Sequence, residues 1–195
     1  MKPILIGIAG GTGAGKSTVT AALQNKYPDD IQVIEFDGYF RKDPPKLEGY
    51  DNFDHPDAIY FDRLVSDLKS LSEGNVTSIP VKAELVGPGE YAFKERDNRD
   101  LLPTKIIIVE GYLALYHPEV RKLFKESIFL DIDHAVRWER RVHFKFGDYE
   151  TKVAIPMHEK YVEPTKEFAD KVIDVSGKSR ELVFTEVEKI ILAYI

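Results

Sequence analysis

The feature that most constrains this chain is a glycine-rich stretch near its amino terminus, which reads GGTGAGKST over residues 10–18. It follows an apolar run over residues 4–9 and precedes a run of helical composition over residues 19–26. The spacing G-x-x-x-x-G-K-S in a strand–loop–helix context is that of a phosphate-binding loop. A glycine-rich turn without a ligand is the alternative, and the Lys and Ser that close the motif argue against it.

Each residue type in this loop has a chemical reason. Glycines allow backbone conformations in which successive N–H groups curl around phosphate oxygens, at a helix N-terminus that favours anions. Lys16 supplies a cation for the β- and γ-phosphates, and the Ser17 hydroxyl is a ligand for Mg²⁺. We therefore expect nucleotide contacts from Gly10, Gly11, Thr12, Gly13, Ala14, Gly15, Lys16, Ser17 and Thr18.

Composition narrows the class of protein. The chain has 195 residues, of which 43% are hydrophobic, so we expect one globular domain over 1–195. A formal net charge of -6 argues against a nucleic-acid partner, and no apolar run is long enough to span a membrane. The absence of cysteine excludes disulfides and thiolate chemistry, and it agrees with a reducing, cytoplasmic location. The first strand begins almost at once, so we expect no signal peptide.

Apolar runs alternate with helical periodicity along the chain, which predicts an α/β fold with a parallel sheet sandwiched by helices. Strands are expected over 4–9, 31–36, 77–81, 106–109, 127–130 and 172–175, with a short edge strand over 90–94. Helices are expected over 19–26, 57–71, 119–124, 133–146, 149–161 and 180–191. Asp57 is the expected cap of the second helix, and Asp131 or Asp133 that of the fourth.

Acidic side chains follow two of the expected strands. Ligands of open parallel sheets gather outside the carboxyl ends of the strands, so Asp37 and Glu110 are expected beside the phosphate loop. Glu110 would act on Mg²⁺ or its waters, as a hard oxygen ligand. Asp37 would face the hydroxyl that accepts the phosphoryl group. Alternatively, Asp37 is a turn former and Glu110 a solvated charge at a strand end.

The helix expected from residue 133 carries three arginines, Arg137, Arg140 and Arg141, at positions that share a face. Guanidinium groups bind phosphate oxygens in a bidentate manner, so residues 133–165 or so are interpreted as a helical lid over the nucleotide. A solvated basic helix face is the alternative.

A long stretch without periodicity, from residue 37 to about residue 56, is expected to be a functional loop. Asp54 would accept hydrogen bonds from substrate hydroxyls, and His55 either binds substrate or packs. The rings of Tyr39 and Phe40 either stack on a flat substrate ring or cover the core.

These motifs together resemble the uridine kinase and phosphoribulokinase family of P-loop kinases, over about residues 4–177. Besides the phosphate loop, the matching strings are DGYF at 37–40, NFDHPDA at 52–58, IPV at 79–81, VEG at 109–111, PMH at 156–158, EPTK at 163–166 and AD at 169–170. The resemblance implies a P-loop NTPase fold. It also implies that Asp37 is the catalytic base, that Asp54 binds ribose hydroxyls and that Glu110 lies near the metal.

The resemblance further implies roles for the arginines. We expect Lys16, Asp37 and Arg141 to act in catalysis, and Arg137 and Arg140 to contact the nucleotide. The substrate would contact Asp37, Tyr39, Phe40, Asp54, His55 and Arg137, and the metal would contact Ser17 and Glu110.

The implied activity is phosphoryl transfer from ATP, with Mg²⁺, to a hydroxyl of a small nucleoside-like substrate such as the 5′-OH of uridine or cytidine. Lys82-Ala83 stands where the family has Tyr-Asp after IPV, and residues 143–148 replace the family's lid segment. Nicotinamide riboside and pantothenate are therefore alternative acceptors. A family member that binds nucleotide without turnover is another alternative.

A nucleotide switch such as a GTPase is the remaining alternative, and the chain lacks the guanine-reading N-K-x-D motif. The oligomeric state, a homo-oligomer included, is left open by the sequence.

Overall fold

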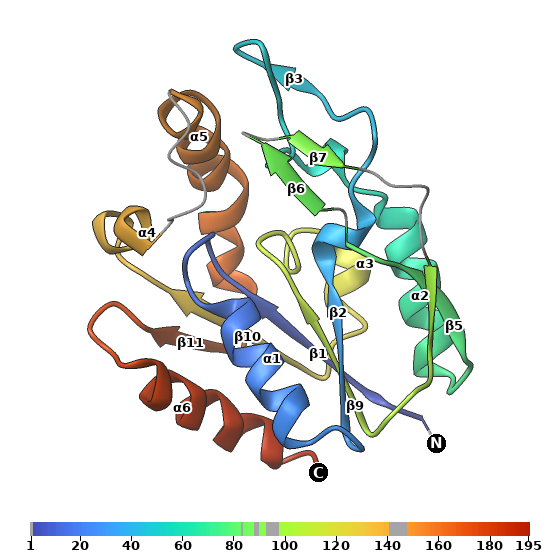
Figure 1. Cartoon of the computed structure of the whole chain (residues 1–195). Helices are drawn as coiled ribbons and strands as arrows, with labels where there is room; N and C mark the ends of the chain where they lie inside the picture. Colours follow the sequence, from blue (N-terminus) through green and yellow to red (C-terminus); the bar gives the residue numbers. More distant parts are fainter. Residues whose placement is uncertain (1, 83, 88–89, 93–97, 141–147) are drawn as a thin grey trace.

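The structure is a computed structural model that describes residues 2–82, 84–87, 90–92, 98–140 and 148–195. Its centre is a sheet of five parallel strands, in the order β11-β10-β1-β9-β2 (Figure 1). These strands are β1 (Ile4–Ala9), β2 (Ile31–Glu35), β9 (Ile106–Glu110), β10 (Glu126–Asp131) and β11 (Lys171–Asp174). The β-branched runs of the sequence thus form the buried sheet that they predict.

Helices cover both faces of this sheet (Figure 1). They are α1 (Lys16–Lys26) and α6 (Arg180–Leu192) on one face, and α2 (Phe61–Ser72) and α3 (Pro118–Arg121) on the other. Successive strand residues point to opposite faces, so Ile6 packs with the α1 and α6 side while Leu5 packs with the α2 side. The α/β sandwich expected from the sequence is confirmed.

Three small antiparallel pairs lie outside the central sheet. They are β3 (Lys46–Leu47) with β4 (Tyr50–Asp51), β5 (Thr77–Pro80) with β8 (Asn98–Leu101), and β6 (Glu84–Gly87) with β7 (Glu90–Ala92). Strands thus form at Thr77–Pro80 and Glu90–Ala92, within the expected ranges 77–81 and 90–94, of which residues 93–94 lie outside the described residues. They pair with local partners and not with the parallel sheet. Strand periodicity shows which face a residue occupies and does not identify the neighbouring strand.

The start of α2 differs from the prediction. Pro56–Ala58 forms the 3-10 turn η2, and α2 begins only at Phe61, with Tyr60 at its N-cap. The Tyr60 amide donates to the Tyr39 carbonyl at 2.9 Å, and Phe40 forms an antiparallel bridge with Ile59. These contacts keep Ile59 extended and Tyr60 outside helical geometry, so the expected capping role of Asp57 is wrong.

The segment interpreted as a lid is helical where it is described. Helix α4 (His134–Arg140) is capped by Asp133, whose carboxylate accepts from the Ala135 amide at 2.8 Å. The predicted continuation over 141–146 lies outside the described residues. After it, the expected helix over 149–161 forms with π-helical turns, in the order η3 (Glu150–Ala154), α5 (Ile155–Met157) and η4 (His158–Val162), followed by the 3-10 turn η5 (Glu163–Phe168).

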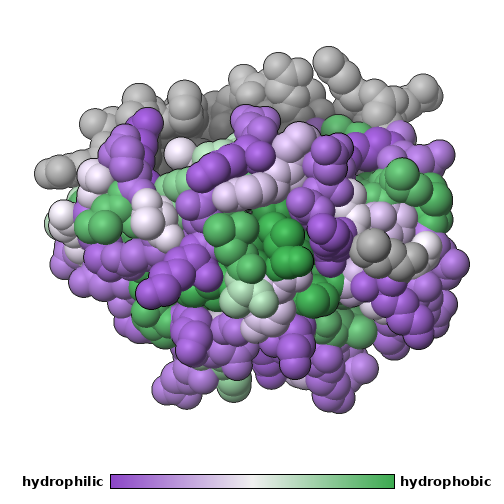
Figure 2. Space-filling model, turned by 90° about the horizontal axis from the view of Figure 1, so that it is seen from below, coloured by the Kyte–Doolittle hydropathy of each residue, from purple (hydrophilic) through white to green (hydrophobic). Residues whose placement is uncertain are grey.

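The face seen from below in Figure 2 is the one at the amino ends of the strands, close to both chain termini. One hydrophobic area lies near its centre, bordered by hydrophilic side chains. None of the helices in the described ranges combines the length and the apolar character that a membrane crossing requires.

Candidate active site

The phosphate loop connects the end of β1 to the start of α1. Three of its glycines have positive φ angles, with values of 139° at Gly10, 88° at Gly13 and 90° at Gly15. Gly15 occupies the N-cap of α1 in a left-handed conformation that other residues adopt at a cost. The loop therefore has the backbone that a phosphate-binding loop requires, and it ends at a helix N-terminus.

Lys16 lies at the first position of α1 and is buried, with 8% of its surface exposed. Its Nζ atom donates a hydrogen bond to the Gly11 carbonyl at 3.1 Å. Burial lowers the pKa of Lys16 from its ordinary value, and the charges of Glu110 and Asp37 oppose that shift. The loop thus curls around an ammonium group that is held out of water and faces two carboxylates.

Glu110 ends β9, in register with Ile8 of β1, and reaches the next residue of the loop. The Ser17 hydroxyl donates to its Oε1 atom at 2.8 Å. Burial raises the pKa of Glu110, and the positive charge of Lys16 opposes the shift. A hydroxyl and a carboxylate at this distance fit Mg²⁺, which takes few protein oxygens and completes its shell with water and phosphate oxygens.

Asp37 lies in the 3-10 turn η1 (Phe36–Tyr39), directly after β2. Its Oδ2 atom forms an ion pair with Lys82 Nζ at 3.2 Å. The structure thus brings Lys16, Asp37 and Glu110 to the same edge of the sheet, as the sequence predicts. Lys82 was not among the expected site residues; the signal for it was the departure from the family's motif after IPV.

Arg137 of α4 lies over the phosphate loop and is almost fully buried, at 1% exposure. A Cβ atom added to Gly11 would lie 2.4 Å from Arg137 Nη1, so the glycine is what permits this approach. The guanidinium is held by two imidazoles: Nη1 lies 2.6 Å from His158 Nε2, and Nη2 lies 2.8 Å from His134 Nδ1.

His158 is the second site residue that sequence reasoning missed. A guanidinium only donates, so His158 Nε2 accepts and carries no proton. Burial, followed by the electrostatic effects of Arg137, His134 and Lys16, lowers the pKa of His158 to about 3, in agreement with that assignment. The PMH string at residues 156–158 was its sequence signal.

A small pocket, partly open to solvent, lies beside the loop. It is lined by Thr12, Asp54, Tyr112, Arg137, Ala154, His158 and Val162. Asp54 Oδ2 accepts a hydrogen bond from the Tyr149 hydroxyl at 2.8 Å, and the His55 ring meets the Tyr161 hydroxyl at 3.0 Å. Asp54 thus borders the pocket, whereas His55 is engaged in packing contacts next to it.

The expectation that Tyr39 and Phe40 contact the substrate is corrected by their burial. They are 1% and 2% exposed, and both belong to the core on the α2 side of the sheet. The Tyr39 hydroxyl donates to Asp67 Oδ2 at 3.0 Å, and the Phe40 ring packs on Phe53 with centroids 5.2 Å apart. Of the remaining lid arginines, Arg140 is the last described residue of α4, and Arg141 lies outside the described residues.

Solved structures share this fold. A possible uridine kinase from Bacillus stearothermophilus aligns with a TM-score of 0.60 and 16% identity, over 89% of this chain and 90% of that one. A phosphoribulokinase from Rhodobacter spheroides aligns with a TM-score of 0.64 and 12% identity, over 89% and 70%. At these identities the likeness shows the P-loop kinase fold.

Relatives with higher sequence identity identify the family. A uridine kinase of Clostridium novyi (strain NT) is 37% identical over 97% of this chain and 96% of its own length. One from Clostridium botulinum (strain Okra / Type B1) is 36% identical over 93% of each chain. Residues 5–180 match the model of the phosphoribulokinase / uridine kinase family. The chain therefore belongs to the phosphoribulokinase / uridine kinase family and is a small-molecule kinase of the uridine kinase type.

Proposed function

We propose that this protein transfers the γ-phosphoryl group of ATP to the hydroxyl of a nucleoside, with the 5′-OH of uridine or cytidine as the first candidate. The observation that supports it most is the position of three charged groups, Lys16, Asp37 and Glu110, at one sheet edge beside the phosphate loop. The relatives named uridine kinase extend over nearly the whole chain and support the same acceptor class. A cytoplasmic location is part of this proposal, and the absence of cysteine agrees with such a reducing compartment.

In this proposal the loop amides and Lys16 bind the β- and γ-phosphates, and Arg137 moves from its imidazole partners to phosphate oxygens. Asp37 orients the acceptor hydroxyl and takes its proton, while Asp54 holds the ribose hydroxyls in the adjoining pocket. Ser17 and Glu110 would hold Mg²⁺, which neutralises phosphate charge when bound. Phosphoryl transfer demands mainly positioning and charge neutralisation, and these groups supply both.

The acceptor is tested directly by incubating the protein with Mg-ATP and single candidates: uridine, cytidine, nicotinamide riboside and pantothenate. ADP release together with a phosphorylated product identifies the acceptor. We expect uridine or cytidine to give the highest kcat/KM. ATP or GTP hydrolysis that no acceptor accelerates would contradict a kinase and favour a nucleotide switch.

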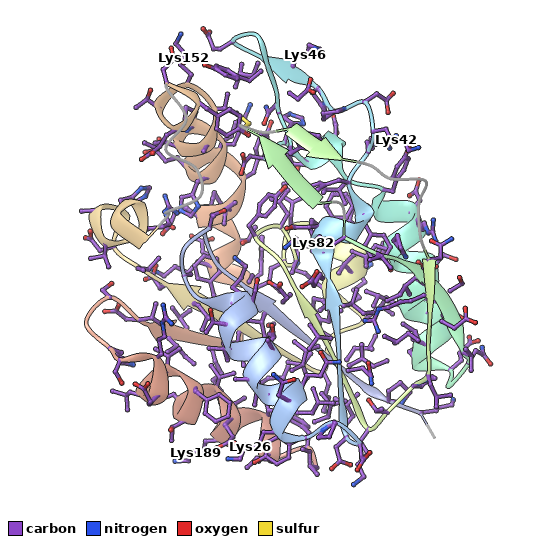
Figure 3. All side chains as sticks on the ribbon, viewed as in Figure 1. Lys26, Lys42, Lys46, Lys82, Lys152 and Lys189 are labelled. Atoms are coloured by element: carbon purple, nitrogen blue, oxygen red, sulfur yellow. The ribbon has the colours of Figure 1, made fainter. Side chains whose placement is uncertain are left out.

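The phosphate-loop assignment is tested by Lys16→Ala. Removing the ammonium that binds the β- and γ-phosphates should lower kcat about 1,000-fold, the upper range for loss of one transition-state contact. Lys26→Ala is a matched control, because Lys26 lies at the other end of the same helix and pairs with Glu188 at 2.7 Å (Figure 3). A Lys16→Ala variant with the wild-type rate would overturn the assignment.

A further inference from the structure

Lys82 follows β5 by two residues and lies among the groups proposed to carry the reaction. In Figure 3 it lies in the middle of the molecule, near the carboxyl ends of β2 and β9, whereas the other labelled lysines lie at the periphery. The proposed function gives this residue no role.

The backbone around Lys82 is held in place from three sides. Strand β5 pairs with β8, and Arg99 of β8 donates to the Val33 carbonyl of β2 at 2.7 Å. The turn that carries Asp37 touches the end of β5, because a Cβ added to Gly38 would lie 2.7 Å from the Pro80 carbonyl oxygen. A larger residue than glycine at position 38 would push the two segments apart. The position of Lys82 relative to Asp37 is therefore fixed by the fold.

The charge environment of Lys82 differs from that of an ordinary surface lysine. Its side chain is 39% exposed, and its Nζ atom lies 3.2 Å from Asp37 Oδ2. Burial by itself lowers the pKa of Lys82, but the charges of Asp37, Glu35 and Glu110 outweigh it and raise the pKa above its ordinary value. Lys82 in turn acts electrostatically on Lys16 and Glu110. These three charges and that of Asp37 therefore form one electrostatic cluster.

We propose that Lys82 is a catalytic residue of the phosphoryl transfer, whose ammonium binds Asp37 Oδ2 before the reaction and the oxygens of the transferring phosphoryl group during it. This inference rests on the proposed function. A second ammonium near the point of transfer adds to the stabilisation that Lys16 provides, where the transition state spreads negative charge over the phosphoryl oxygens.

With Lys82 in this role, every bond and proton of the transfer is accounted for. The acceptor oxygen forms a bond to the γ-phosphorus, the bond from that phosphorus to the β–γ bridging oxygen breaks, and ADP keeps the bridging oxygen. The acceptor proton goes to Asp37, whose carboxylate thereby becomes neutral. The Lys82 ammonium has three N–H donors, so it can contact the phosphoryl oxygens while Asp37 is still ionised, and it keeps that contact once Asp37 is neutral.

The first test is Lys82→Met, which keeps the length of the side chain and removes the charge. We expect kcat to fall about 100-fold, the loss typical of one preorganised transition-state contact, with the KM for ATP within about threefold of wild type. Lys82→Arg should restore most of the rate. Lys46→Met is the matched control, because Lys46 pairs with Asp51 at the same 3.2 Å on the β3–β4 hairpin, away from the sheet edge (Figure 3).

A second measurement does not depend on the acceptor. ADP, Mg²⁺ and aluminium fluoride together mimic the transferring phosphoryl group, and calorimetry compares their binding with that of Mg-ADP alone. Lys82→Met should weaken the fluoride complex at least about tenfold and leave Mg-ADP binding unchanged. Equal loss of both affinities would mean a structural role and would overturn the inference, as would wild-type affinity for the fluoride complex. Failure of the wild type to phosphorylate any nucleoside would overturn the proposed function instead.

Discussion

At the scale of single residues, the site is a set of charges withdrawn from water. Lys16 and Glu110 are buried. Burial lowers the pKa of Lys16 and raises that of Glu110, so it favours the neutral form of each side chain. Burying a charge costs free energy unless an opposite charge lies near it, so the positive charge of Lys16 and the negative charge of Glu110 each lower the cost of burying the other. A nucleotide phosphate and a metal ion would provide these groups with stronger partners than they have in the free protein.

His158 makes the stability of the protein depend on pH. Its pKa is about 3 in the folded protein, whereas an unfolded chain has the ordinary value of about 6.5. Between these values the unfolded chain binds one more proton, so stability is fully present above pH 6.5 and falls as the pH decreases. The free energy of unfolding should therefore lose about 2 kcal/mol through this group between pH 7.5 and pH 5.

Urea unfolding of the wild type and of His158→Gln, at both pH values, measures that loss. Glutamine can still accept from Arg137 but does not titrate, and the variant retains every other histidine. We expect the variant to lose about 2 kcal/mol less than the wild type on acidification. Equal losses in both proteins would show that Arg137 and His158 are not in contact.

At the scale of elements, helix α4 brings Arg137 to the phosphate loop. Its described part is short, and its first turn depends on the Asp133 carboxylate, which accepts from the Ala135 amide. The π-helical turns of residues 150–162 present His158 to the same guanidinium. Such turns are frequent at functional sites because they displace a side chain from regular helical spacing.

Removal of the α4 cap should therefore affect nucleotide binding as well as stability. Asp133→Ala should cost about 1 kcal/mol of unfolding free energy and raise the KM for ATP severalfold, because Arg137 is no longer held in position. Ser179→Ala is the matched control, since Ser179 caps α6 by accepting from the Leu182 amide at 3.2 Å. We expect the control to lose similar stability without a change in KM. An unchanged KM in Asp133→Ala would argue that α4 does not position the nucleotide.

The elements themselves were largely predictable, and their departures have physical reasons. The parallel strands follow from β-branched runs. The sequence left the cap of α4 between Asp131 and Asp133, and the structure assigns it to Asp133. The start of α2 was not predictable, because backbone contacts with residues 39–41 keep residues 59–60 out of the helix. Local sequence carries no information about a contact made twenty residues away.

At the scale of the whole molecule, the pocket joins segments that are far apart in the chain. Asp54, from the loop before α2, accepts from the Tyr149 hydroxyl at 2.8 Å, and Arg137 and His158 line the same pocket. The acceptor would therefore bind between the loop and the helical segment, next to the phosphate loop. In the proposed function, Asp54 would therefore contact the acceptor and the phosphate loop would contact ATP, which separates the two binding roles.

Asp54→Ala tests that separation. Loss of a charged hydrogen-bond acceptor should raise the KM for the nucleoside 10-fold or more, roughly the effect of one charged hydrogen bond, with the KM for ATP nearly unchanged. Tyr149→Phe is the control, because it keeps the carboxylate and removes only the tyrosine hydroxyl. Initial rates with each substrate varied in turn measure both constants. A parallel rise in both KM values would contradict a role in acceptor binding.

Residue types and their spacing were enough to predict the phosphate loop, the alternation of strands and helices, and the acidic residues at two strand ends. These features are encoded locally, by glycine conformations, side-chain periodicity and residue types at fixed spacing. The folded structure was needed to place Tyr39 and Phe40 in the core, His158 against Arg137, and Lys82 against Asp37. Each of these depends on which distant segments pack together, since a side chain's partner is set by the fold and not by its neighbours in sequence.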